Sequence, residues 1–166
     1  MLAEWSGFFV AAAGACAALG GLIIVAASVS VTEMIAIPGM ASRAGVAIAL
    51  LVASTIIALA ALIPGLSAGG FGWLVLLAGG IALGLALESL WRLVRTRQPG
   101  AREHRGLGES IVKGSFGVLP SAALCVGGVL LLLGDAAGTY WIAAGILLSI
   151  LSAVVSAWVV LVEIRR

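Results

Sequence analysis

The chain consists of long apolar runs separated by a small number of charged positions. No charged residue occurs in the ranges 5–32, 44–87, 114–134 and 136–162. An α-helix rises about 1.5 Å per residue, so about 20 apolar residues cross the hydrocarbon core of a membrane. The first, third and fourth runs therefore have room for one such helix each, and the longer second run has room for two.

A turn signal divides the longest run. Pro64 and Gly65 are followed by Ser67 and by glycines at 69, 70 and 72, a combination typical of turns. The runs are continuously apolar, rather than alternating as barrel strands do, so we expect helices. The predicted fold is an all-α, polytopic transmembrane helical bundle that residues 1–166 form as one domain. Its five spans are predicted near 6–32, 44–63, 71–91, 115–134 and 139–162.

The composition excludes a soluble enzyme and a disordered chain. Apolar residues make up 63% of the 166 residues, charged residues only 10%, and the mean hydropathy is +1.26. An ordinary soluble domain has about a quarter charged residues, and one of this size buries only about two-thirds of its chain surface. So small a fold cannot hide this much apolar surface from water.

The basic residues predict the orientation of the bundle. With five spans, all nine lysines and arginines fall on one side of the membrane, and the opposite side carries only Glu4 and Asp135. Short basic segments stay in the cytoplasm, so we expect the N-terminus outside and the C-terminus in the cytoplasm. Four or six spans would distribute the basic residues over both sides.

The aromatic residues lie near the predicted ends of the spans, as in the aromatic belts at membrane surfaces. Toward the outer surface the spans place Trp5, Phe8, Phe9, Phe71, Trp73, Tyr140 and Trp141. Toward the inner surface they place Trp91, Phe116 and Trp158. This pattern uses no charged residue, so it supports the five-span arrangement independently.

Three spans carry small residues at helical spacing, a pattern that favours close helix–helix contact in membranes. The positions are Gly7, Gly14 and Gly21 in the first span, Gly80 and Gly84 in the third, and Gly145, Ser149, Ser152 and Ser156 in the fifth. We interpret them mainly as contacts within one bundle. The alternative is that one of these stripes forms a contact between copies of the chain in a homo-oligomer.

Four charged residues are predicted at the inner membrane surface, where they are candidates for an ion-pair cluster. Glu88 and Arg92 are four residues apart in the favourable order, and Glu33 and Arg43 lie at the same predicted surface. The alternative interpretation is that the four side chains reach separately for the interface.

The segment 92–114 is the largest polar segment. Its six basic and two acidic residues give a net charge of +4 (6 − 2) with His104 neutral. We predict a cytoplasmic loop that contacts anionic lipid headgroups. Its candidate contacts are Arg95, Arg97, Arg102, Arg105 and Lys113. The simpler explanation is that the loop is basic because it is cytoplasmic, and nothing in it indicates nucleic-acid binding.

The chain lacks the side chains of most intramembrane chemistry. Its one histidine lies in the basic segment, and the predicted spans contain no lysine and no charge near a midplane. We therefore predict no catalytic residue, no cofactor and no metal site. Cys16 and Cys125 are interpreted as small buried hydrophobes. The remaining polar groups of the spans are the hydroxyls of Ser28, Ser30, Ser54, Thr55, Ser121, Ser149, Ser152 and Ser156.

The N-terminal part of the chain, 1–65, resembles a known group of proteins. The string EWSGFFVA at 4–11, the Gly/Ala-rich helix after it, the Ile-Pro-Gly turns at 37–39 and 63–65, and Arg43 carry the likeness. They are similar to uncharacterised small multi-span membrane proteins of high-GC, actinobacteria-like bacteria. Where such proteins end the first helix in a Ser-Ile-Asn-Leu type string, this chain has Ser-Val-Ser-Val at 28–31. The resemblance implies a multi-pass protein of the bacterial plasma (inner) membrane and supplies no catalytic residue.

Two functions remain open at this point. The first is an accessory, scaffold or regulatory subunit without enzymatic activity, which packs against copies of itself or against another membrane protein. The alternative is an oligomeric channel or small-solute permease whose hydroxyl-bearing helices face a central axis. The small-residue stripes, the basic segment and the lack of catalytic groups favour the first.

Cysteine labelling tests the predicted topology. In a parent with both native cysteines replaced by alanine, we expect Asp135→Cys to react with a membrane-impermeant maleimide in intact cells. Arg102→Cys should react only after the membrane is opened, because its segment is predicted to face the cytoplasm. The cysteine-free parent gives the background, and labelling of both positions from the same side would contradict five spans.

Overall fold

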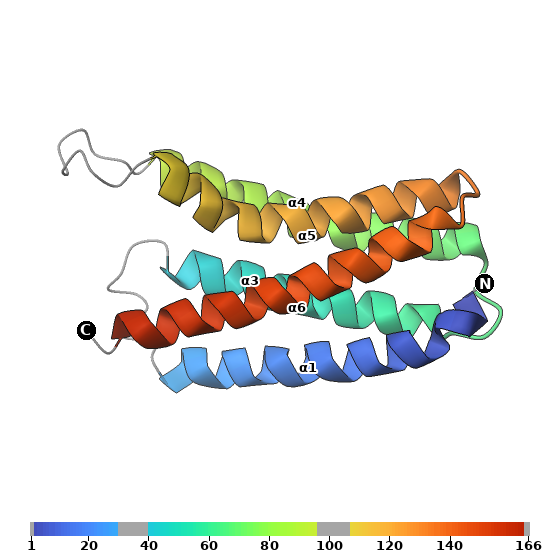
Figure 1. The fold of residues 1–166 in the computed structure, drawn as a ribbon, viewed down its shortest axis with the longest axis horizontal. Helices are drawn as coiled ribbons and strands as arrows, with labels where there is room; N and C mark the ends of the chain where they lie inside the picture. Colours follow the sequence, from blue (N-terminus) through green and yellow to red (C-terminus); the bar gives the residue numbers. More distant parts are fainter. Residues whose placement is uncertain (1, 30–39, 96–106, 165–166) are drawn as a thin grey trace.

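The computed structural model describes residues 2–29, 40–95 and 107–164. Over these residues the chain is all-helical, with one short 3-10 helix, five α-helices and no strand (Figure 1). The elements are η1 Leu2–Trp5, α1 Ser6–Val29, α3 Met40–Ala61, α4 Ala68–Arg95, α5 Leu107–Leu132 and α6 Ala137–Ile164. The predicted all-helical fold is thus confirmed for the described part of the chain.

The five helices lie side by side along one long axis. η1 lies at one end of the bundle and the end of α6 at the other, while α4 and α5 flank α3 and α6 on one side and α1 flanks them on the other (Figure 1). In the most apolar stretch of α3, 56% of the residues are buried inside the bundle, whereas in that of α1 only 28% are. α3 is therefore the central helix, and α1 is peripheral.

The segment 92–114, predicted as a loop, is helical at both of its ends. Residues 92–95 continue α4 and residues 107–114 belong to α5, while 96–106 lie outside the described residues. The loop prediction is therefore wrong at its flanks. Hydropathy marks the apolar part of a helix, whereas the helix itself extends until its backbone hydrogen bonding ends, and long basic side chains can follow the surface of a membrane.

Within the described residues, four helices are long and apolar enough to cross a membrane. These stretches are Ser6–Val29, Ser42–Ala61, Ala68–Arg92 and Ala137–Trp158. In α5 the apolar stretch is shorter, Gly117–Leu132. Nevertheless α5 contains 26 residues, and at about 1.5 Å per residue a helix of that length exceeds the roughly 30 Å of a hydrocarbon core. The four long helices make the fold compatible with a membrane bundle.

Two turns depend on glycines with positive φ. Gly65 has φ 78° after α3, and Gly134 has φ 81° after α5, a conformation that costs glycine little. Beyond Gly134 the Asp135 amide donates to the Leu130 carbonyl at 2.9 Å, as in a Schellman ending. The Asp135 carboxylate then accepts a hydrogen bond from the Ala137 amide at 2.8 Å. Asp135 therefore stabilises the start of α6.

Two adjacent glycines let α5 approach two helices at once. A Cβ atom on Gly127 would lie 2.6 Å from Ile142 Cγ1 and 2.8 Å from Gly138 O, both in α6. A Cβ atom on Gly128 would lie 3.1 Å from Gly72 O in α4. Such spacing leaves no room for a side chain, so the backbones approach as closely as glycine allows. α5 is thus held between α4 and α6.

The core includes two aromatic residues that the sequence placed in a membrane belt. Phe9 and Phe71 are fully buried, and their rings meet edge to face at 6.2 Å between centroids. The belt interpretation is therefore wrong for these two residues. Phenylalanine has no polar atom to keep in water, so it enters the core wherever a neighbouring helix covers it. Trp73 and Trp158, by contrast, are largely exposed.

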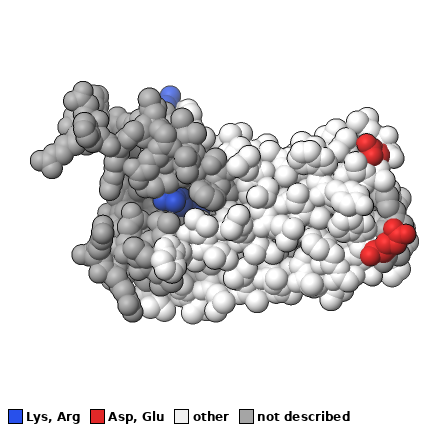
Figure 2. Space-filling view, in the orientation of Figure 1, with Lys and Arg blue, Asp and Glu red and all other residues white. Residues whose placement is uncertain are grey.

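The outer surface of the bundle is apolar along most of its length. Large side chains such as Leu77 (70% exposed) and Leu133 (76% exposed) face outward. Figure 2 shows acidic residues at one end of the visible face, basic residues at the other, and uncharged described surface between them. Charges at both ends and an apolar middle are the arrangement that a hydrocarbon slab favours.

Gly127→Ala should destabilise the bundle, because the new methyl group meets backbone atoms of α6. We expect a loss of about 1–3 kcal/mol in the free energy of unfolding, typical of overpacking, measured by unfolding in detergent. Gly14→Ala on α1 makes the same chemical change where nothing lies within 4 Å. This control should change stability little or raise it by up to about 1 kcal/mol, and equal destabilisation by both variants would contradict the packing described.

Candidate functional site

The basic end of the bundle carries one of the predicted ion pairs. Arg92 and Glu88, four residues apart on α4, form a salt bridge in which Arg92 Nε also donates to Glu88 Oε1 at 3.1 Å. Both side chains are well exposed. Arg43 lies half-buried on α3, and Glu33 lies outside the described residues. Of the predicted four-residue cluster, the described contacts therefore include the Glu88–Arg92 pair alone.

The next turn of α4 holds a cation–aromatic contact that sequence reasoning missed. The guanidinium carbon of Arg95 lies 4.1 Å from the centroid of the Trp91 ring, within the range of a cation–π interaction. Both residues are exposed. The signal was present in the sequence, because residues four apart on a helix are neighbours.

Four other candidate lipid contacts were predicted in the basic segment. Arg97, Arg102 and Arg105 lie outside the described residues, and so does the side chain of Lys113, although its backbone belongs to α5. Arg95 is therefore the candidate headgroup contact whose surroundings are described.

A hydroxyl pair joins α3 and α4 at the basic end. Ser42 Oγ donates a hydrogen bond to Ser89 Oγ at 2.9 Å, and both groups are partly buried. Sequence reasoning had no means of pairing these serines, because they are 47 positions apart and each is ordinary by itself.

The small-residue stripe of α1 faces away from the bundle. Gly7, Gly14 and Gly21 are exposed, and nothing lies within 4 Å of a Cβ atom built on any of them. The face of α1 that packs inward contains Phe9 and Cys16. At about 100° per residue, the glycine stripe is on the opposite side of the helix. Contact within one bundle therefore does not involve this stripe among the described residues.

The glycine pair of α4 is exposed in the same way. Gly80 and Gly84 have nothing within 4 Å of an added Cβ atom. The neighbouring Gly79 packs instead, because its Cβ atom would lie 3.1 Å from Leu124 Cβ and 3.3 Å from Cys125 Sγ of α5. The sequence contains both glycines side by side, and the one that was not singled out makes the contact.

The third predicted stripe lies inside the bundle for most of its length. A Cβ atom on Gly145 would lie 2.8 Å from Leu124 Cγ of α5. Ser149 and Ser152 are buried, whereas Ser156 is partly exposed. This stripe therefore packs α6 against its neighbours.

Most of the described hydroxyls with hydrogen bonds donate within their own helix. Thr55 Oγ1 donates to Leu51 O, Ser121 Oγ to Gly117 O and Ser149 Oγ to Gly145 O, each at 2.8 Å. Within the described residues, Ser54 Oγ and Thr139 Oγ1 are buried without a hydrogen-bond partner. Cys16 and Cys125 are both free thiols; Cys16 is buried, as expected of a small buried hydrophobe, whereas Cys125 is only partly buried.

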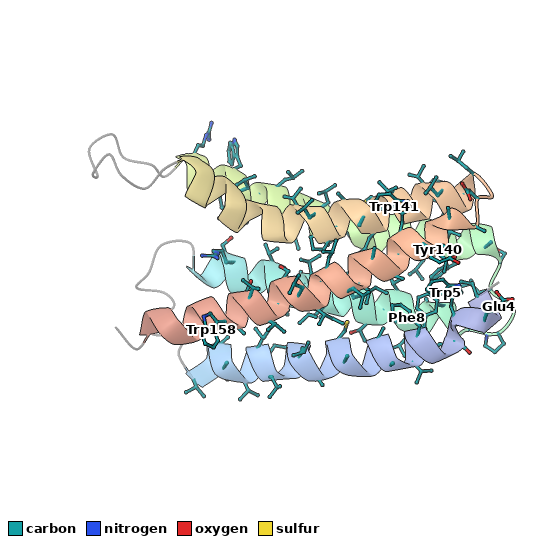
Figure 3. The ribbon with its side chains drawn as sticks, in the orientation of Figure 1. Glu4, Trp5, Phe8, Tyr140, Trp141 and Trp158 are labelled. Atoms are coloured by element: carbon teal, nitrogen blue, oxygen red, sulfur yellow. The ribbon has the colours of Figure 1, made fainter. Side chains whose placement is uncertain are left out.

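An aromatic cluster ties the start of the chain to α6. The Trp5 ring meets Tyr140 edge to face at 4.9 Å and Phe8 at 5.8 Å between centroids. Figure 3 shows Trp5, Phe8 and Tyr140 together at the end of the bundle opposite Trp158. Edge-to-face pairs contribute about 0.5–1.5 kcal/mol each beyond the area they bury. The cluster therefore anchors η1 and the first turn of α1.

Comparisons with protein families, with curated proteins and with solved structures give no match for this chain. Among the residues that the structure describes, no group of three His, Cys, Asp or Glu side chains is placed to hold a metal ion. The candidate interaction surfaces of the described structure are the outward faces of α1 and α4 and the basic end that includes Arg92 and Arg95.

Ser42→Ala and Ser89→Ala should be energetically coupled, because each removes the same interhelical hydrogen bond. We expect a coupling energy of about 0.6 kcal/mol, typical of such bonds in membrane bundles, from SDS unfolding of both single variants and the double variant. Ser28→Ala supplies the control, since Ser28 Oγ donates to Val25 O in its own helix. Its coupling to Ser89→Ala should be near zero, and equal coupling in the two pairs would refute the contact.

Proposed function

We propose that the protein is a non-enzymatic accessory, scaffold or regulatory subunit of a membrane, which acts by packing one of its helices against another membrane helix. The partner is a second copy of the chain or a different membrane protein. The proposal includes five spans, an outer N-terminus and a cytoplasmic C-terminus. The resemblance of residues 1–65 supports a bacterial plasma membrane as the location.

The distribution of charge supports this membrane placement. Glu4, which Figure 3 places at one end of the bundle, and Asp135, in the turn between α5 and α6, are both exposed. Arg43 lies near the start of α3 and Arg92 and Arg95 near the end of α4, which is the other end. The long apolar surface between the ends suits a hydrocarbon core. Because basic residues favour the cytoplasmic side, the end with the arginines is the cytoplasmic end in this proposal.

The observation that carries the proposed function is the direction of the α1 glycine stripe. α1 uses one face, which includes Phe9, Ala12 and Cys16, to pack on the bundle. Its opposite face repeats glycine every seven residues, with Ala11 and Ala18 between. Lipid is as apolar as leucine, so helix association in a membrane depends on close packing that small residues permit. α1 therefore offers a second packing face.

The alternative function, an oligomeric channel or small-solute permease, has less support. The hydroxyls of Thr55, Ser121 and Ser149 already donate to carbonyls of their own helices, so they offer less polar surface to a pore. Ser54 Oγ, buried without a partner among the described residues, is the observation that favours a polar path. Flux of ions or small neutral solutes through liposomes containing the purified protein would favour the channel.

Ala18→Leu should weaken association through α1, because it places bulk in the centre of the glycine stripe. Ala15→Leu is a matched control on the same helix: Ala15 is also exposed, but it lies about 80° around the helix from the middle of the stripe. Overpacking costs about 1–3 kcal/mol, so we expect Ala18→Leu to raise the dissociation constant about tenfold or more. Light scattering of the detergent-extracted protein measures the mass of the particle.

The same measurement can contradict either the proposed function or the use of the α1 stripe. A wild-type particle with the mass of one chain and no co-purifying membrane protein would contradict the proposed function. An equal effect of Ala18→Leu and Ala15→Leu would show that association does not use the stripe. Retention of a different membrane protein, lost in Ala18→Leu alone, would support the subunit function with that protein as partner.

A further inference from the structure

The outward face of α4 combines two exposed glycines, which leave open space among larger apolar side chains, with a basic end. At about 100° per residue, Gly80, Gly84, Trp91 and Arg95 fall within about 60° of one another around the helix. All four residues are exposed. The same face therefore carries two exposed glycines in the middle of the helix and a cationic and an aromatic side chain at its end.

The basic end suits an anionic headgroup. Glu88 and Arg92 form a salt bridge and offset each other's charge, so Arg95 supplies the net positive charge among these three residues of α4. The guanidinium carbon of Arg95 lies 4.1 Å from the centroid of the exposed Trp91 ring. A guanidinium has five N–H donors and binds phosphate through pairs of them. Tryptophan also prefers the depth of lipid headgroups.

The two glycines lie within the reach of an acyl chain whose phosphate is at Arg95. Gly84 and Gly80 precede Arg95 on α4 by distances that correspond to about 16 and 22 Å along a helix. One leaflet of the hydrocarbon core is about 15 Å deep and its headgroup region adds about 5–7 Å, so Gly84 lies along the acyl chain and Gly80 near its end. Added Cβ atoms at both glycines have nothing within 4 Å. Leu77 and Leu87, 70% and 48% exposed, are apolar neighbours of these glycines three residues away on the helix.

We propose that this face of α4 binds one anionic phospholipid, with its phosphate at Arg95 and Trp91 and an acyl chain along Gly84 and Gly80. Charge complementarity favours a lipid over a second helix, because an anionic phospholipid brings a negative phosphate to Arg95, whereas close packing of an apolar helix on Gly80 and Gly84 needs no charge. The α1 stripe has no such combination among its described residues, and the charge nearest its start is the acidic Glu4. The proposal rests on the membrane insertion proposed above, but not on association through α1.

Native mass spectrometry of the full chain in detergent tests the site. The protein is mixed with equimolar dioleoylphosphatidylglycerol and dioleoylphosphatidylcholine, and the ratio of the two bound lipids is measured. We expect wild type to prefer phosphatidylglycerol and Arg95→Gln to lower that preference about fivefold, the factor associated with one basic group at an anionic surface. Arg95→Lys, which retains the charge but not the planar guanidinium, should lower it less.

Two matched variants separate a site from diffuse attraction. Arg43→Gln removes the same charge from α3 and should leave the ratio within about twofold of wild type. Gly80→Leu places a side chain in the open space beside Gly80 and should lower the occupancy of both lipids. Gly14→Leu makes the same change on the glycine stripe of α1 and should leave the occupancy unchanged. Equal effects of Arg43→Gln and Arg95→Gln, or of Gly14→Leu and Gly80→Leu, would overturn the proposal.

Further outcomes identify other occupants. Loss of oligomer mass rather than of lipid in Gly80→Leu would assign the face to a partner helix and overturn the lipid site. Displacement of phosphatidylglycerol by excess glycerol phosphate would show that the phosphate is recognised without the acyl chain, which also overturns it. Absence of all bound lipid from wild type would count against membrane insertion as well, whereas loss of selectivity alone counts only against this site.

Discussion

The close approach of α5 to α4 and α6 is the contact on which the bundle depends. In lipid, burying a leucine brings little gain, because the surroundings are already apolar, so helices associate through van der Waals contact and backbone proximity. Gly127 and Gly128 provide that proximity on two sides of α5. Gly127 lies against Gly138 of α6, and Gly128 lies against Gly72 of α4. This three-helix contact sets the positions of α4, α5 and α6 relative to one another, and α3 packs against α4, α6 and α1 beside it.

Two groups of glycines in the described helices have different consequences. Those between α4, α5 and α6 fill no space and cannot accept a methyl group without displacing backbone. Those on the outward faces of α1 and α4 leave open surface. The first group holds the bundle together, and the second makes its exterior uneven where a lipid or another helix can fit. The two proposed interactions use this second group on opposite flanks of the molecule, at α1 and at α4 (Figure 1).

The helices themselves were predictable from the sequence, and the partners of their side chains were not. Long charge-free runs and the glycine turn near residue 65 located all five helices to within a few residues, except where α5 extends back into the basic segment. By contrast, the packing of Gly79 rather than Gly80, the burial of Phe9 and Phe71, and the Ser42–Ser89 hydrogen bond depend on which helices are neighbours. Adjacent positions on a helix differ by about 100°, so neighbouring glycines look equivalent until a second helix is placed.

What the sequence determined alone is the one-dimensional part of the structure: an all-helical chain, apolar lengths that match a membrane, and charges confined to the helix ends. These features follow from hydropathy and helical rise, which are properties of each segment by itself. Only the tertiary structure decided that α3 is central and α1 peripheral, that α5 lies between α4 and α6, and that the most regular glycine stripe points outward. Those choices depend on rotation about each helix axis, and a helix that is apolar on every side has no polar face to specify that rotation.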